Sequence, residues 1–254
     1  MRPLLGDLRA EQDDLRRIVE DADLFTSTPA DGWDVRDSIS HLAGTDVEAT
    51  LSMTDPDAFV AKLPQVGADI DGFLTRQLTE RRDLPRDVFL AQWQEGFEAL
   101  LTAFEKVDPA AKLPWYGPPM SPASFATARI MEYWAHGQDV ADGLGVTRTP
   151  TARLRHICHI GFRTRGFSYA NRGRTPPAVD VRLELTAPDG TTWSYGDDNA
   201  PESVTGPALD FCLLVTQRRH RDDVDVVAHG AAADEWLSIA QAYAGPPGPG
   251  REKR

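Results

Sequence analysis

Apolar residues recur three and four positions apart through most of the first 147 residues, a spacing that gathers them on one face of an α-helix. The pattern is strongest over residues 88–107, where Phe89, Trp93 and Phe104 share such a face. Weaker runs predict further helices up to about residue 25 and over residues 34–53, 70–78 and 124–144. Four or more helices joined by loops predict a helical bundle.

The pattern changes after residue 147. Residues 179–186 alternate apolar and polar side chains, which is the period of a half-buried strand. A turn at 188–191 predicts a return strand at 192–195, and so a β-hairpin. Further elements of this part are predicted as helices over 151–169, 208–217 and 231–244 and a short strand near 224–228.

These two patterns predict two domains. We expect a helical domain over residues 1–147 and a smaller α+β domain over residues 150–244. The last ten residues, 245–254, are rich in glycine, proline and charge, so we expect a disordered tail there.

Composition narrows the class of protein. The formal net charge of −12 argues against nucleic-acid binding, which needs basic patches. No apolar run approaches the roughly 20 residues that a membrane helix needs, and the charged N-terminal residues do not form a secretory signal. The two cysteines, Cys158 and Cys212, form no closely spaced pair, so a disulfide framework is not expected and a reducing cytoplasm fits.

Candidate chemistry is concentrated in one predicted helix. Glu132 and His136 stand four residues apart, so both side chains project from one face about one turn apart. A carboxylate and an imidazole so placed can bind one divalent metal ion, and His41 is the leading candidate for a third ligand. Two imidazoles and one carboxylate are a standard set for catalytic zinc and leave one position open. Gln138 and Asp139 are candidates for hydrogen bonds that orient the ligands.

The same residues also allow a simpler interpretation. Arg129, Glu132, His136 and Asp139 lie opposite the apolar stripe of their helix, where a solvated polar face is ordinary. His41 shares a similar polar stripe in its own predicted helix. The residues by themselves leave both interpretations open.

Two motifs carry a resemblance to a known family. Residues 32–43 read GWDVRDSISHLA and residues 129–145 read RIMEYWAHGQDVADGLG. Together they resemble the mycothiol-dependent maleylpyruvate isomerase group, within the DinB-like superfamily of metal-binding four-helix bundles. The resemblance implies an N-terminal DinB-like four-helix bundle followed by a sterol-carrier-like α+β domain. It also implies that His41, Glu132 and His136 bind the metal.

The resemblance further implies thiol chemistry. A thiol coordinated to a divalent metal, for which zinc is favoured, is held as the thiolate. A mycothiol-like thiolate that adds to a small electrophilic, acidic substrate and then leaves gives cis–trans isomerisation, and one that stays attached gives S-transfer. Two other functions stay open: a hydrolase that uses metal-bound water at the same ligands, and a non-enzymatic carrier of a small apolar ligand with a structural metal. A homodimer is also considered.

One more role comes from the resemblance. An arginine of the C-terminal domain is expected to hold the acidic substrate near the metal, and Arg218 or Arg219 is the candidate by approximate position. Both follow a predicted helix, where cations also stabilise the helix C-terminus, so a purely structural role is the alternative.

Overall fold

The computed structural model divides into two compact units, Met1–Thr147 and Arg148–Arg254. It describes residues 1–248 and 250–253, and for Ile70 and Asp71 only the backbone is described. Each unit is considered by itself below.

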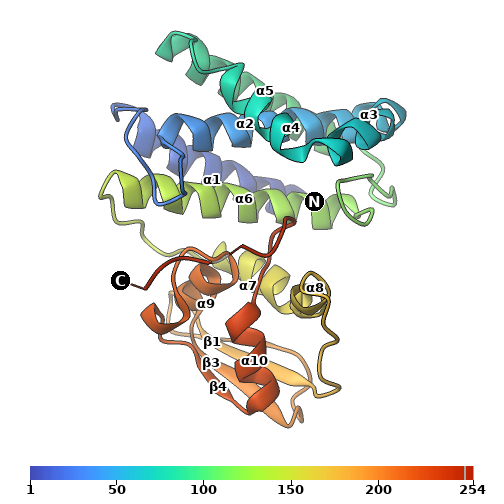
Figure 1. The fold of residues 1–254 in the computed structure, drawn as a ribbon, viewed down its shortest axis with the longest axis vertical. Helices are drawn as coiled ribbons and strands as arrows, with labels where there is room; N and C mark the ends of the chain where they lie inside the picture. Colours follow the sequence, from blue (N-terminus) through green and yellow to red (C-terminus); the bar gives the residue numbers. More distant parts are fainter. Residues whose placement is uncertain (249, 254) are drawn as a thin grey trace. The chain divides into compact units, whose positions relative to one another are not determined.

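The first unit is helical (Figure 1). Its helices are α1 (Arg2–Val19), α2 (Val35–Thr54), α3 (Pro56–Ala68), α4 (Ile70–Thr79), α5 (Arg86–Lys106) and α6 (Pro122–Gly143). Helix α2 is central, because it packs against α5 and α6 as well as against α3 and α4, while α1 packs against α6. The long helices α1, α2, α5 and α6 therefore form the bundle, and α3 and α4 form an insertion between α2 and α5.

The start of α2 is fixed by its own side chains. Asp34 is the N-cap, and its Oδ1 accepts a hydrogen bond of 2.8 Å from the Asp37 backbone N–H. The Asp37 Oδ2 accepts one of 3.2 Å from the Asp34 backbone N–H, which completes a capping box. Arg82 bridges both carboxylates at 2.8 Å. The helix that carries His41 thus begins where the sequence predicts.

Helix α6 is buried on nearly all sides. Ile130, Tyr133 and Ala141 of its apolar stripe are fully buried, as predicted. Arg129 and Asp139, however, are only 2% and 1% exposed, so the interpretation of their side of the helix as a solvated face is wrong. The reason is that α1 and α2 both pack against α6, and the contact with α2 covers these polar residues.

Two features of the first unit differ from the prediction. The first helix ends at Val19 rather than near residue 25. Helix α3 was not expected, because Pro64 lies in its interior and a proline there normally interrupts a helix. The N-terminal Pro56 and the Asp55 cap, which accepts from the Ala58 N–H at 3.0 Å, support the start of α3 instead.

The second unit is an α+β structure. Its elements are α7 (Leu154–Arg163), α8 (Arg165–Ala170), β1 (Val181–Thr186), β2 (Thr192–Tyr195), β3 (Glu202–Pro207), α9 (Ala208–Val215), a 3-10 turn (Arg221–Asp223), β4 (Val227–His229) and α10 (Ala231–Ile239). The sheet order is β2-β1-β3-β4, with β1 and β3 parallel and the other neighbours antiparallel. The predicted fold class, a helical bundle followed by a smaller α+β part, is confirmed.

In the second unit, some observed elements differ locally from the predicted ones. The helix predicted over 151–169 is two helices separated at Thr164. Strand β3 was not predicted, because Val204 is its one buried residue and the alternation is weak. Cys158 and Cys212 are buried in α7 and α9 and are not joined in a disulfide. The predicted disorder of residues 245–254 includes Pro249 and Arg254, which lie outside the described residues.

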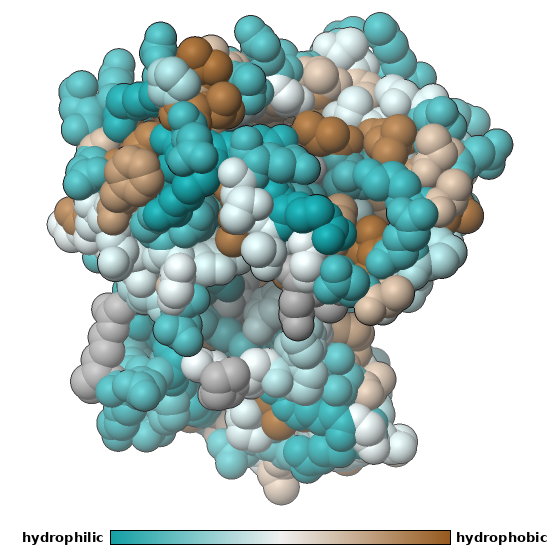
Figure 2. All heavy atoms as spheres, turned by 45° about the horizontal axis from the view of Figure 1, so that its top comes forward, coloured by the Kyte–Doolittle hydropathy of each residue, from teal (hydrophilic) through white to brown (hydrophobic). Residues whose placement is uncertain are grey.

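One face of the molecule is mainly polar. On the face shown in Figure 2, hydrophilic residues predominate and apolar ones lie in small groups. Large exposed apolar residues such as Phe25, Val47 and Val227 come from distant parts of the chain. Among the described residues, none of the helices combines the length and the hydropathy that crossing a bilayer requires.

Candidate metal centre

Helices α2 and α6 bring three predicted ligands together. The Nε2 atom of His41 lies 3.8 Å from Oε2 of Glu132, and the Nε2 atom of His136 lies 3.5 Å from the same oxygen. The two imidazole centroids are 4.7 Å apart. One ligand atom from each of the three residues lies within 4.8 Å of the others. The convergence of His41 with the Glu132/His136 pair could not follow from sequence spacing, because 91 residues separate His41 from Glu132 along the chain.

The donor set suits a divalent cation. Ligand atoms at about 2.0–2.2 Å from a tetrahedral zinc ion lie about 3.3–3.6 Å from one another. The measured distances of 3.5 and 3.8 Å to the shared Glu132 oxygen are close to that range. The side chains of the three residues are 12–23% exposed, so the cluster is shielded without being sealed from solvent.

The local charges keep Glu132 ionised. Burial alone would raise the pKa of its carboxyl, but hydrogen bonding and charge from His136 and His41 hold that pKa well below its usual range. Glu132 is therefore a carboxylate, which is the form that ligates a metal.

An aromatic ring covers the imidazole pair. The Trp33 ring stacks on His136 at a centroid distance of 5.7 Å and lies 5.4 Å from His41. Gly32, with φ of 72°, provides the left-handed turn before it. The Trp33 carbonyl accepts from the Thr28 N–H at 2.9 Å, which fixes that turn. The position of Trp33 gives it a role in the cluster that sequence spacing did not reveal.

A second polar cluster joins the same two helices. Asp46 Oδ1 accepts hydrogen bonds from Nε and Nη2 of Arg129 at 3.2 and 2.8 Å. Asp46 Oδ2 accepts from the Tyr133 hydroxyl at 2.5 Å, and that hydroxyl accepts from Trp93 Nε1 at 3.0 Å. Burial raises the pKa of Asp46, while the Arg129 charge and the Tyr133 hydrogen bond oppose the rise. We call Asp46, Arg129 and Tyr133 the buried triad.

The buried triad was not predicted as a unit. Asp46 lies five residues after His41, and Arg129 and Tyr133 flank Glu132 on α6. The triad therefore fixes α2 and α6 close to the positions from which the candidate ligands project. No local sequence signal identifies it, because Asp46 and Arg129 alone resemble helix-surface residues and Tyr133 belongs to the apolar stripe of its helix.

The two candidate orienting residues differ. Oδ2 of Asp139 lies 3.9 Å from Nδ1 of His136, and Asp139 is only 1% exposed, so its carboxylate is near enough to influence the imidazole. The Gln138 amide instead donates to Oδ1 of Asp142 at 2.9 Å. The Gln138 amide nitrogen is thus engaged with Asp142, and its support of a histidine stays a prediction.

The two candidate arginines lie in the second unit. Nη1 of Arg218 donates to the Thr216 carbonyl at 2.6 Å, at the C-terminal end of α9. Nη1 of Arg219 donates to the Arg218 carbonyl at 2.7 Å. These bonds fit the helix-terminus role, and a role in holding substrate stays a prediction.

Comparison with known proteins identifies relatives of this chain. The family model described as mycothiol maleylpyruvate isomerase N-terminal domain matches residues 5–141. A model described as wyosine base formation matches residues 177–229. Uncharacterized proteins from two strains of Mycobacterium tuberculosis are each 46% identical over 252 residues, covering 98% of both chains.

Solved structures show the same fold. A crystal structure of mycothiol-dependent maleylpyruvate isomerase aligns with a TM-score of 0.58 at 16% identity, covering 89% of this chain and 92% of that one. A histidine-to-alanine mutant of that isomerase aligns with a TM-score of 0.60 at 14% identity and the same coverage. The family model covers more than half of this chain and agrees with the resemblance of the two motifs. The chain therefore belongs to the family of the mycothiol maleylpyruvate isomerase N-terminal domain.

Proposed function

We propose that this chain is a divalent-metal-dependent enzyme that activates a low-molecular-weight thiol, such as mycothiol, for reaction with a small electrophilic, acidic substrate. The reaction is cis–trans isomerisation or S-transfer. The observation that carries this proposal is the convergence of His41, Glu132 and His136 at distances suited to one cation. Family membership suggests the thiol, since the matching model is named for mycothiol and both solved structures are described as mycothiol-dependent.

Each residue has a distinct part in this proposal. His41, Glu132 and His136 hold the metal, for which zinc suits two imidazoles and a carboxylate. When bound, such an ion lowers the pKa of a coordinating thiol so that the thiolate is available at neutral pH. Trp33 restricts the imidazole rings by stacking on His136 and by lying tilted against His41. Asp139 supports His136, and Arg218 or Arg219 is proposed to hold an acidic group of the substrate. A cytoplasmic location and a homodimer remain predictions.

The test uses the purified full chain loaded with cobalt in place of zinc. We expect one metal per chain, and a thiolate-to-cobalt charge-transfer band when mycothiol is added. His41→Ala should abolish both, whereas His229→Ala, an exposed histidine of the second unit, should leave both unchanged. Maleylpyruvate with mycothiol then tests for isomerisation.

The outcomes separate the rival functions. Metal binding without any thiolate band, together with ester or amide hydrolysis, would favour the hydrolase. Metal that binds without any accompanying activity would favour the carrier. A His41→Ala variant with full metal content would contradict the ligand set itself.

A further inference from the structure

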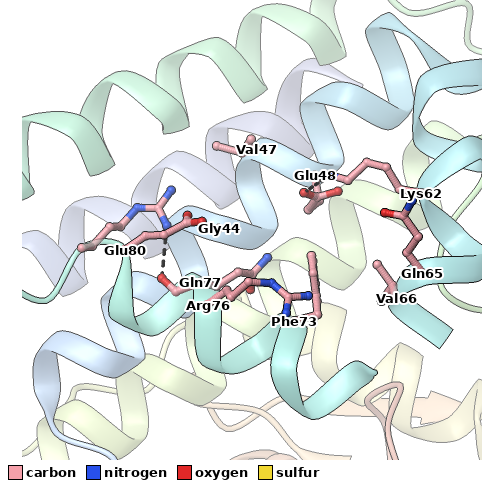
Figure 3. Close-up of a pocket in the computed structure, with 11 residues that line it drawn as sticks. Gly44, Val47, Glu48, Lys62, Gln65, Val66, Phe73, Arg76, Gln77 and Glu80 are labelled. Atoms are coloured by element: carbon pink, nitrogen blue, oxygen red, sulfur yellow. Dashed lines mark hydrogen bonds and ion pairs between the residues drawn. The ribbon is translucent and has the colours of Figure 1, made fainter. Parts of the chain in front are cut away.

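A cavity lies on the side of α2 that faces the insertion formed by α3 and α4. Its volume is about 380 Å³. Figure 3 shows its lining residues, which come from these three helices and from the two positions directly after α4. The lining includes Gly44, Glu48, Lys62, Phe73, Arg76 and Gln77.

Gln77 is the residue that points to a ligand. It is 7% exposed, and its Oε1 is buried with no hydrogen-bond partner among the described residues. A buried amide oxygen without a partner costs free energy, and in the wall of a cavity a bound hydrogen-bond donor accounts for it. Gly44 allows this placement, because a Cβ at that position would lie 2.8 Å from the Gln77 side chain. Glycine inside a helix costs about 1 kcal/mol relative to alanine, so the close approach is a specific feature.

Among the described residues, the charges that line the cavity nearly cancel, with three cations and two carboxylates. Lys62 Nζ lies 2.5 Å from Oε1 of Glu48, and Nη1 of Arg76 lies 3.5 Å from Oδ2 of Asp69. The remaining charged lining residues, Glu80 and Arg81, have opposite signs. A dianionic ligand would need a surplus of cations. This lining instead offers donors and acceptors of both kinds, with Phe73 as an apolar wall, which suits a neutral ligand rich in hydroxyl groups.

The cavity is close to the candidate metal ligands along α2. His41, Gly44 and Glu48 are spaced i, i+3 and i+7, so they lie on one side of the helix. At 1.5 Å per residue, Gly44 is about 4.5 Å and Glu48 about 10.5 Å beyond His41 along the axis. A small molecule of ordinary size can span that length.

We infer that this cavity binds the polyhydroxylated part of the thiol whose sulfur reaches the metal, an inference that rests on the proposed function. Gln77 recognises hydroxyl groups through its amide, and Phe73 packs against the carbon face of a sugar ring. The cavity thereby selects a glycosylated thiol over a simple one.

The test compares two thiols on the cobalt-loaded full chain. Mycothiol joins a cysteine derivative to a polyhydroxylated sugar and inositol, whereas N-acetylcysteine has no such group. Dissociation constants are taken from the thiolate-to-cobalt band. Gln77→Met keeps the side-chain volume and removes the amide. It should raise the dissociation constant of mycothiol about tenfold, because the loss of about 1.4 kcal/mol of binding free energy corresponds to that factor. N-acetylcysteine binding and cobalt content should not change.

A matched control and a second cavity variant complete the test. Gln92→Met, at an exposed position of α5, is the matched control and should change neither affinity. Phe73→Leu gives a second variant of the cavity and should weaken mycothiol selectively as well. Equal mycothiol affinity in wild type and both cavity variants would overturn the inference while leaving the proposed function intact. If the cavity variants instead lose binding of maleate, measured by calorimetry, the cavity belongs to an acidic substrate and the inference is overturned. The lack of any band in wild type would overturn the proposed function as well.

Discussion

Two polar clusters connect α2 and α6, and they differ in how far their polar atoms form hydrogen bonds within the protein. In the buried triad, both oxygens of Asp46 accept hydrogen bonds from Arg129 or Tyr133, and none of the three side chains is appreciably exposed. In the candidate metal centre, a carboxylate oxygen of Glu132 faces ring nitrogens of His41 and His136 at 3.5–3.8 Å, longer than strong hydrogen bonds.

The difference separates a structural cluster from a binding cluster. The buried triad is complete within the protein, so its energetic role is to hold α2 and α6 in one relative position. The metal centre gathers three potential ligands whose geometry is better matched to a shared cation than to one another. Stability should therefore depend strongly on the first cluster, and ligand binding on the second.

The largest expected effect comes from breaking the buried triad. Arg129→Met leaves the Asp46 carboxylate buried without its cation, which should lower the free energy of unfolding of the first unit by about 3–5 kcal/mol. Hydrogen exchange of amides in α2 and α6 measures this locally. The double variant Asp46→Leu with Arg129→Met should recover most of the loss, because an apolar pair leaves no unpaired charge. A loss below about 1 kcal/mol in the single variant would show that the triad does not hold the helices.

Metal removal should have the next largest effect. A ligand that binds only the folded protein stabilises it by about 2.7 kcal/mol at a free concentration 100 times its Kd. We therefore expect chelation to lower the melting temperature of the wild type and to leave Glu132→Gln unaffected, because that variant lacks the anionic ligand. Calorimetry with and without zinc measures both. An equal response of the two proteins would place the metal elsewhere.

The sequence predicted one half of the metal centre better than the other. Glu132 and His136 are four residues apart on one helix, so their proximity is a local property that spacing reveals. His41 joins them only through the packing of α2 against α6. It was the leading candidate for the third ligand, and the resemblance of its motif then supported that choice. Asp46 and Arg129 are 83 residues apart, and nothing in either segment indicates that they meet.

Prediction of the fold is limited in the same way, because local patterns are visible in the sequence and contacts between distant segments are not. The start of α2 was predicted because Asp34 and Asp37 form a local capping box. Helix α3 was missed because Pro64 contradicts the local rule, and tertiary contacts with α2 and α4 override it. The cavity beside Gln77 also depends on that insertion, so no local pattern could have predicted it.

A single hydrogen bond within the triad should have a smaller effect. Tyr133→Phe removes the hydroxyl that donates to Asp46 and accepts from Trp93. Loss of one hydrogen bond to a charged group should cost about 2 kcal/mol. Urea denaturation of the metal-free protein measures it, with metal affinity as the second readout. Phe97, whose ring also packs on Tyr133, offers the control Phe97→Leu, which should cost stability without affecting the Asp46 hydrogen bonds.

The smallest effect is expected for an exposed arginine–carboxylate ion pair, that of Arg9 with Glu98. Arg9 and Glu98 form two hydrogen bonds of 2.6 and 2.7 Å, but both side chains are 44% exposed. Solvent screening should limit their coupling to at most about 1 kcal/mol in a double-mutant cycle of Arg9→Met and Glu98→Gln at neutral pH. The Arg9 hydrogen bond lowers the pKa of Glu98 from its ordinary value of 4.5, so in acid the unfolded chain binds more protons at this site than the folded one. The coupling should therefore be fully present above pH 4.5 and disappear as the pH falls through the lowered pKa. A coupling as large as that of Asp46 with Arg129 would mean that burial is not what distinguishes the two pairs.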